Sequence, residues 1–137
     1  RSGRVTGVQT CALPIFGAQA LDLMHAAAEG RLSEAQVNWA DDHAMTVVMA
    51  AEGYPGSYAK GQAIGGLDDL PEDSMHVMFH AGTELRNGQV VSSGGRVLNA
   101  TARGQSLREA ADRAYALVDG VDWPGAAVRR DIGWRAL

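Results

Sequence analysis

Cysteine is nearly absent from this sequence of 137 residues, which contains only Cys11. A single cysteine cannot form an internal disulfide, so a small secreted scaffold held together by disulfides is excluded. It also cannot supply a cysteine-rich zinc site by itself. Hydrophobic residues make up 46% of the chain and charged residues 20%, which is the composition of an ordinary globular domain. The length fits one domain, or one domain and part of another.

Positive charge is also scarce. The chain has 12 Lys and Arg and 16 Asp and Glu, which gives a net charge of −4. A nucleic-acid-binding protein usually shows a basic surface, so we expect no nucleic-acid partner. Lys60 is the only lysine, and this bias toward arginine fits either GC-rich coding or phosphate recognition by guanidinium groups. No apolar run approaches the roughly 20 residues that span a bilayer. We therefore expect no membrane partner and a cytoplasmic location.

Residues 1–16 have neither a helical period nor a clean alternation of apolar and polar residues. The run from residue 7 to 15 resembles the translation of a sequencing adapter. We therefore expect residues 1–16, Cys11 included, to be foreign to the natural protein. The alternative is an ordinary disordered arm at the N-terminus.

Two segments show the spacing of an amphipathic helix. In residues 18–28 apolar side chains recur at helical spacing, and Gly30 follows as a helix-ending residue. In residues 106–118 Ser106 stands three residues before a glutamate, which predicts a capping box, and Gly120 is the predicted end. The predicted buried stripe of this second helix is Leu107, Ala110, Ala111, Ala114, Tyr115 and Val118.

Three segments are predicted as strands. Residues 44–51 and 75–81 are apolar and partly β-branched, which is typical of buried strands, and residues 96–102 alternate. Asn87 and Gly88 lie between short extended runs, and both tolerate the positive φ of a type I′ hairpin turn. Because the connections resemble hairpins, the sequence predicts an α+β fold with a mostly antiparallel sheet flanked by helices.

Three glycine-rich loops are the first candidates for a binding site: residues 52–58 (EGYPGSY), 80–83 (HAGT) and 92–97 (SSGGRV). Such loops bring backbone N–H groups within reach of an anion. The alternative, which the residues alone favour slightly, is that these loops are tight turns between strands. Arg129 and Arg130 form either a phosphate clamp or a solvated chain end.

The histidines do not predict a metal site. His76 and His80 are four residues apart, which on a strand places them on one face about 13 Å from each other, too far to share one metal ion. We expect His25, His43, His76 and His80 to be structural or hydrogen-bonding residues. No complete set of catalytic residues is visible, so the catalytic residues stay unassigned.

Five motifs occur in order and together carry a family resemblance. From about residue 18 to residue 137, the sequence resembles the C-terminal region of the phosphoribosylamine–glycine ligases, also called glycinamide ribonucleotide synthetases, which are ATP-grasp ligases. Five ordered motifs are far more specific than any one glycine-rich loop. The motifs are VVMAAEGYPGSYAKG (47–61), MFHAGT (78–83), SSGGRVLNATARG (92–104), REAADRAYALV (108–118) and RRDIGWRAL (129–137).

The resemblance implies a reaction that joins glycine to 5-phosphoribosylamine with conversion of ATP to ADP and phosphate, in de novo purine biosynthesis. ATP and Mg²⁺ would be bound mainly by an upstream domain that this sequence lacks, so we expect an inactive fragment. Residues 17–36 would be the helical tail of that ATP-grasp domain, and residues 37–137 the C-terminal domain. Its partners would be phosphoribosylamine, glycine, ATP and the rest of its own chain. An apolar surface facing the missing domain would be left bare and promote self-association.

The resemblance also implies a binding site for phosphoribosylamine, in which Arg96 is the first candidate for a phosphate contact. The alternative for Arg96 is an arginine at a strand end, paired with a carboxylate. A stand-alone binding module for a phosphorylated sugar or nucleotide, or another carboxylate–amine ligase, are the alternative functions. The implied substrate-binding residues are Tyr54, Gly56 and Tyr58 in one loop, Gly94, Gly95 and Arg96 in the next, and then Arg129 and Arg130.

Overall fold

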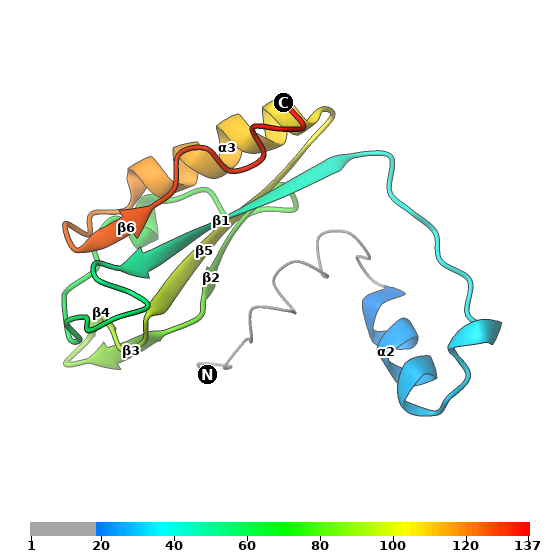
Figure 1. Ribbon diagram of the computed structural model, residues 1–137, viewed down its shortest axis with the longest axis horizontal. Coiled ribbons are helices and arrows are strands. Elements are labelled where there is room, and N and C mark those ends of the chain that lie inside the picture. The colour runs from blue at the N-terminus through cyan, green and yellow to red at the C-terminus, as the bar shows by residue number, and fades with distance from the viewer. Residues whose placement is uncertain (1–18) are drawn as a thin grey trace.

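The computed structural model of the protein describes residues 19–137, so the predictions for residues 1–16 lie outside the described part. Its centre is a four-stranded antiparallel sheet in the order β2-β5-β1-β6 (Figure 1). The α+β class with a mostly antiparallel sheet is confirmed. The strands are β1 (His43–Ala51), β2 (His76–His80), β5 (Arg96–Gly104) and β6 (Ala126–Val128).

Helix α3 (Leu107–Gly120) covers one face of the sheet and forms the core with β1 and β5. The Ser106 half of the predicted capping box is present, because the Ser106 hydroxyl accepts a hydrogen bond from the Glu109 backbone N–H at 3.2 Å. The Glu109 carboxylate accepts from the Gln105 N–H at 2.7 Å rather than from Ser106. Leu117, which the predicted stripe omitted, is 1% exposed and belongs to the core. The other buried residues of the helix are Ala110, Ala111, Ala114 and Val118.

The two strands predicted as buried are buried less completely than expected. β1 alternates, and its Val48 is 39% exposed, because α3 covers only one face of the sheet. β2 is an edge strand whose residues are half-buried or exposed. The third predicted strand, β5, lies between β2 and β1, and its residues from Val97 to Ala102 are all buried. Apolar composition therefore predicted the strands correctly but not their places in the sheet.

Two further details differ from the prediction. Gly120 is the last residue of α3 rather than the residue after it, and it lies against Leu70, where a Cβ atom would be 2.5 Å from the Leu70 side chain. Strand β6 was not predicted. It has only three residues, and its pairing with Met49–Ala51 of β1 is a contact between segments far apart in the chain.

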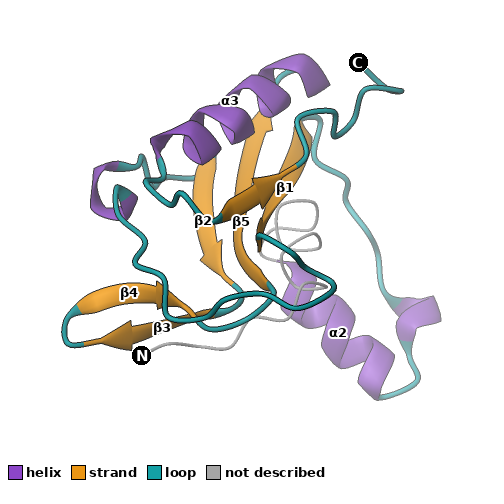
Figure 2. Ribbon diagram, turned by 60° about the vertical axis from the view of Figure 1, so that its left-hand side comes forward, coloured by secondary structure: helices purple, strands orange, loops and turns teal. Residues whose placement is uncertain are grey.

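The predicted hairpin is confirmed by β3 (Thr83–Arg86) and β4 (Gln89–Ser92). Its turn residues Asn87 and Gly88 have φ values of 51° and 81°, as a type I′ turn requires. Figure 2 shows this hairpin beside the end of the sheet at which β2 ends and β5 begins.

Helix α2 (Ala20–Ala28) and the short helix η2 (Leu32–Glu34) lie apart from the sheet (Figure 1). The predicted end of α2 is confirmed, because Gly30 has a φ of 71° and donates a hydrogen bond to the Ala27 carbonyl. Leu21 and Met24 are 71% and 52% exposed, so this helix carries large apolar side chains that the described chain leaves exposed. Within residues 19–137 no helix is both long and apolar enough to cross a membrane.

Candidate functional site

The three predicted glycine-rich loops meet at one end of the sheet. We call residues 52–61, which contain Tyr54 and Tyr58, the tyrosine loop. The backbone N–H of Ala51, immediately before this loop, donates to the Gly95 carbonyl at 2.8 Å. The N–H groups of Ser93 and Gly94 both donate to the Gly82 carbonyl, at 2.7 and 3.0 Å. Loops that are far apart in the sequence are thus joined by backbone hydrogen bonds. We call residues 52–61, 80–83 and 92–96 the loop cluster.

Close packing at two positions explains the glycines of this cluster. A Cβ atom on Gly95 would overlap the Tyr54 ring and lie 3.1 Å from the Tyr58 ring. A Cβ atom on Gly82 would lie 2.5 Å from the Arg96 carbonyl oxygen and 3.0 Å from the Gly94 Cα atom. Only glycine permits such approaches. The tyrosine rings in turn meet edge to face, with centroids 6.0 Å apart.

A β-bulge determines which way Arg96 is directed. Met49 pairs with Leu98 but Ala50 pairs with Arg96, so Val97 is an extra residue in β5. A bulge re-aims the side chain beside it, and here it puts Arg96 on the same face as Ala50, opposite α3. Arg96 is exposed, and its guanidinium group forms no ion pair with a residue of the described chain. The alternative interpretation was that Arg96 pairs with a carboxylate, and the described residues form no such pair.

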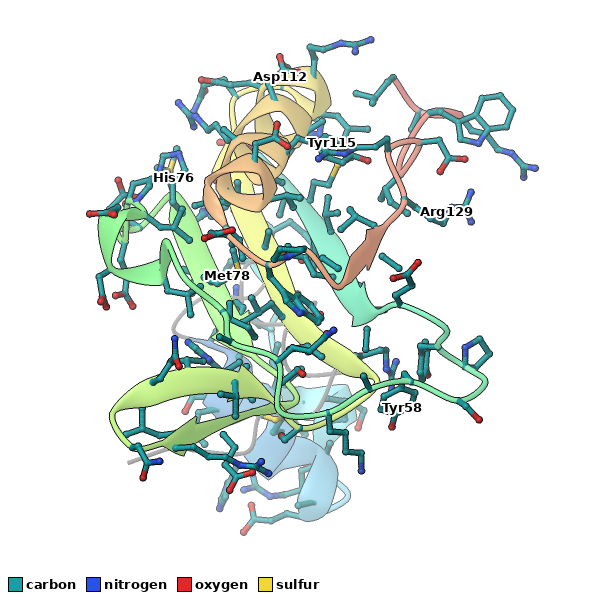
Figure 3. The ribbon with its side chains drawn as sticks, turned by 90° about the vertical axis from the view of Figure 1, so that its left-hand side faces the viewer. Tyr58, His76, Met78, Asp112, Tyr115 and Arg129 are labelled. Carbon is teal, nitrogen blue, oxygen red and sulfur yellow. The ribbon has the colours of Figure 1, made fainter. Side chains whose placement is uncertain are left out.

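Arg129 and Arg130 do not join the loop cluster. Figure 3 shows Arg129 apart from Tyr58, on the side of Tyr115 and α3. Arg129 forms two hydrogen bonds to Asp131, at 2.8 and 2.6 Å, and Arg130 forms an ion pair with Asp119 at 2.6 Å. These hydrogen bonds lower the pKa of the Asp131 carboxyl and raise the pKa of both arginines. A phosphate bound there would compete with carboxylates that already neutralise both cations.

Lys60 is a residue of the loop cluster that our candidates omitted. It is exposed, and its Nζ atom lies 5.9 Å from the centroid of the Tyr58 ring. Beside it, the Gly61 N–H donates to the Ser92 carbonyl at 2.6 Å, which ties this part of the loop to the end of β4. Two signals in the sequence could have found it: Lys60 is the sole lysine, and it lies in the motif of residues 47–61.

The histidines behave as predicted where the structure gives them partners. His80 Nδ1 lies 2.9 Å from the Thr83 hydroxyl, and His76 Nδ1 lies 2.9 Å from Asp73 Oδ1. Burial lowers the pKa of His80, so its imidazole is neutral at pH 7. No group of three or more potential metal-ligating side chains occurs among the residues that the structure describes.

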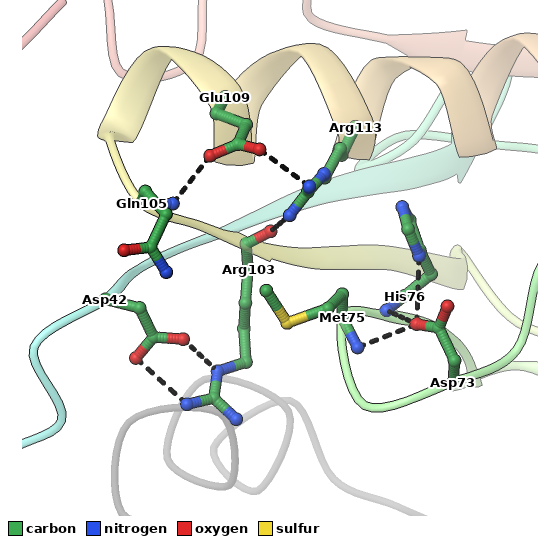
Figure 4. Close-up of polar contacts among 8 residues, drawn as sticks. All are labelled: Asp42, Asp73, Met75, His76, Arg103, Gln105, Glu109 and Arg113. Atoms are coloured by element: carbon green, nitrogen blue, oxygen red, sulfur yellow. Dashed lines mark hydrogen bonds and ion pairs between the residues drawn. The ribbon is translucent and has the colours of Figure 1, made fainter.

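The opposite end of the sheet carries a structural polar network (Figure 4). Arg103 at the end of β5 forms a two-point ion pair with Asp42, at 2.5 and 2.9 Å, and this pair lowers the pKa of the Asp42 carboxyl. Arg113 of α3 donates to the Arg103 carbonyl at 2.7 Å and pairs with Glu109. Because these cations are engaged with the protein itself, this end offers no free anion site comparable with Arg96.

The fold and the loop cluster define a class of domain: an α+β unit that presents glycine-rich turns, tyrosines and a free cation from one end of an antiparallel sheet. Residues 44–135 match the family described as phosphoribosylglycinamide synthetase, C domain. This match covers more than half of the chain. The chain therefore belongs to that family.

Individual relatives agree with this assignment. A phosphoribosylamine–glycine ligase of Mesorhizobium japonicum is 48% identical over 117 residues, which are 85% of this chain and 27% of the relative. A chloroplastic phosphoribosylamine–glycine ligase of Arabidopsis thaliana is 52% identical over 114 residues, 82% of this chain and 21% of the relative. The crystal structure of a phosphoribosylamine–glycine ligase of Thermotoga maritima superimposes with a TM-score of 0.65 at 34% identity, covering 82% of this chain and 27% of the other. The chain spans about a quarter of the length of the relatives that it matches.

Proposed function

We propose that the protein to which this chain belongs joins glycine to 5-phosphoribosylamine at the expense of ATP, an early step of purine biosynthesis. The family membership and the names of the relatives support this activity. The observation that carries the site is Arg96. This exposed cation lies on the sheet face opposite α3 and directly follows Gly95, which contacts the tyrosine loop. Its planar guanidinium group suits two-point binding of the sugar phosphate.

The role of this chain in the reaction is to bind and orient phosphoribosylamine. Holding the phosphate at Arg96 and the glycine-rich turn places the sugar so that its amine can meet the activated carboxyl group of glycine. Such positioning contributes to catalysis by removing the entropy cost of bringing two reactants together. No group of three or more potential metal-ligating side chains occurs among residues 19–137. ATP and Mg²⁺ would be bound by the remaining part of the ligase.

The apolar surface of α2 supports a division of the chain into two parts. In this proposal residues 17–36 belong to the ATP-grasp domain, and residues 37–137 form the C-terminal domain. The exposed Leu21 and Met24 would pack against the remainder of the ATP-grasp domain. The cytoplasmic location stays a prediction, and the relative from Arabidopsis thaliana is described as chloroplastic.

A chimeric enzyme tests the activity. Residues 44–135 would replace the matching segment of the Mesorhizobium japonicum ligase, and formation of glycinamide ribonucleotide from glycine, ATP and phosphoribosylamine would be measured. We expect an active chimera, and we expect Arg96→Gln to raise the KM for phosphoribosylamine about 10- to 100-fold, the range for loss of charge-assisted hydrogen bonds. Arg129→Gln is the matched control and should change this KM less. A folded chimera without activity would refute the proposed function.

A further inference from the structure

Gln62 directly follows the tyrosine loop and binds the end of β4 through its backbone. Its N–H donates to the Ser92 hydroxyl at 3.1 Å, and its carbonyl accepts from the Ser92 N–H at 2.8 Å. The Ser92 carbonyl in turn accepts from the Gly61 N–H at 2.6 Å. Ser92 is fully buried, and its N–H, carbonyl and hydroxyl are all paired with residues 61 and 62. Because Ser92 directly precedes the turn of residues 93–96, these bonds join the end of the tyrosine loop to that turn.

The Gln62 side chain connects the same place to the segment between α3 and β6. Trp123 Nε1 donates to Gln62 Oε1 at 3.1 Å, and Trp123 is 5% exposed as part of the core. An indole N–H can only donate, so it fixes the carboxamide with its oxygen toward Trp123. Gly125 lies against the same carboxamide, which a Cβ atom on Gly125 would overlap. The Gly125 carbonyl accepts from the N–H of Glu52, the first residue of the tyrosine loop, at 2.9 Å.

These contacts hold the tyrosine loop at both of its ends. The chain at the start of the loop is bonded to the carbonyls of Gly125 and Gly95. The end of the loop is followed by Gln62, which contacts Gly125 through its side chain and Ser92 through its backbone. Gln62 therefore contacts both the segment that holds the start of the loop and the strand that leads into the glycine turn. A shift of Gln62 would move the tyrosine loop relative to that turn.

We propose that Gln62 is a positioning residue that sets the distance between the tyrosine loop and the turn of residues 93–96. In this role it acts through Ser92 and Gly125 and does not touch the ligand. The proposal rests on the proposed function, in which this turn holds the phosphate of phosphoribosylamine. A displacement of about 1 Å in a binding site can lower the reaction rate about 100-fold, because the productive geometry is lost. Without the Gln62 oxygen, the buried Trp123 N–H would also lack its acceptor.

Kinetics of the chimeric ligase test this role. Gln62→Met keeps the length of the side chain but removes the oxygen, and it should raise the KM for phosphoribosylamine about tenfold, the factor for one lost hydrogen bond. The KM values for glycine and ATP should stay within about twofold. Gln62→Glu keeps an acceptor and should restore most of the affinity for phosphoribosylamine. Tyr115→Phe is the matched control, because it removes a hydroxyl that bonds to the backbone of Arg129 and Ile132 outside the loop cluster, and it should leave all three KM values unchanged.

An unchanged KM for phosphoribosylamine in Gln62→Met, or an equal rise in Tyr115→Phe, would overturn the proposal. The double variant Gln62→Met, Trp123→Phe removes both partners of the side-chain bond, so that no buried N–H is left unpaired. Its KM for phosphoribosylamine should stay raised, because the connection between the loop and the Trp123 segment is still missing. A return to the parent value would show that only the unpaired N–H mattered, and it would overturn the positioning role.

Hydrogen exchange in the 137-residue chain separates this proposal from the proposed function, because it requires no activity. Gln62→Met should speed exchange of the Glu52 and Ser92 amides about tenfold, since their hydrogen bonds open more often. Tyr115→Phe should leave both rates unchanged, with circular dichroism as the folding control for each variant. A chimera without ligase activity refutes the function, whereas faster exchange in Gln62→Met alone still supports the positioning of the loop. Unchanged exchange at both amides would overturn it.

Discussion

Helices α2 and α3 both show the pattern of an amphipathic helix, but the apolar side chains of α3 are buried and those of α2 are largely exposed. In α3, Ala110, Ala114 and Leu117 are at most 1% exposed against the sheet. In α2, Leu21 and Met24 are more than half exposed, and Ala20 is the only buried residue. The comparison shows that periodicity predicts a helix and its apolar face. It does not say whether the partner of that face lies in the same piece of chain.

The N-terminal ends of the two helices also differ, because only α3 has a side-chain cap. α3 has a side-chain cap at Ser106, whereas Gln19 at the start of α2 makes no capping hydrogen bond and instead accepts one from the Asn38 backbone. α2 has nine residues, and isolated helices shorter than about 12–15 residues are marginal in water. Helix α2 therefore depends on contacts outside itself, which agrees with the proposed packing against the rest of a ligase.

The largest expected effect comes from matched leucine truncations in the two helices. Leu117→Ala should lower the free energy of unfolding by about 2–5 kcal/mol, because it leaves a cavity under α3. Leu21→Ala should change it by less than about 0.5 kcal/mol, because this side chain is 71% exposed. Denaturant titration of both variants measures the difference. Equal losses would show that α2 is packed as firmly as α3 in solution.

The close approach of α3 to β5 predicts the next effect. A Cβ atom on Gly104 would lie 2.7 Å from the Ala110 backbone nitrogen and 2.9 Å from the Glu109 Cβ atom. Gly104→Ala should therefore destabilise the protein by about 1–3 kcal/mol through overpacking. Gly65→Ala is the control, because its nearest neighbour would be a side-chain atom of Asp122 at an ordinary 3.5 Å. Thermal unfolding of the two variants would contradict this interpretation if Gly104→Ala were the more stable.

The Asp42–Arg103 ion pair joins the linker after α2 to the sheet and makes stability depend on pH. Arg103 lowers the pKa of Asp42 in the folded state, so the pair stabilises the protein above the unfolded pKa of about 3.9. This contribution is lost as the pH falls through the folded pKa. Asp42→Asn should cost about 1 kcal/mol at pH 7 and progressively less as the pH falls below the unfolded pKa. Chemical denaturation at several pH values measures it, and a pH-independent difference would argue against the pair.

The smallest expected change in stability concerns the bare surface of α2. Leu21→Lys with Met24→Lys should change the free energy of unfolding by less than about 0.5 kcal/mol, because both positions are exposed. The same variant should strongly reduce self-association of the 137-residue chain, since it removes the apolar patch. Light scattering against concentration is the measurement. A wild-type chain that stays monomeric at high concentration would contradict the prediction.

The candidate site was predictable only in parts. The tyrosine loop and the Gly94-Gly95-Arg96 turn stood out in the sequence because of their glycines. Their meeting depends on the sheet, since the hydrogen bond from Ala51 to Gly95 forms only when β1 and β5 pair. Lys60 lies within the motif of residues 47–61, but nothing in the spacing of that motif indicates that its side chain lies over the Tyr58 ring, so this contact required the structure.

The sequence by itself determined the local features of this protein: the two helices, the hairpin turn at Asn87 and Gly88, the cap at Ser106 and the ordered motifs that mark the family. Each depends on residues within one or two turns of chain, where propensity and steric limits act directly. The tertiary structure alone decided that β5 lies between β2 and β1 and that three glycine-rich loops meet. It also decided that a bulge places Arg96 on the sheet face opposite α3, whereas Arg129 and Arg130 form ion pairs with carboxylates. These outcomes depend on contacts between distant segments, and long-range register and packing determine such contacts.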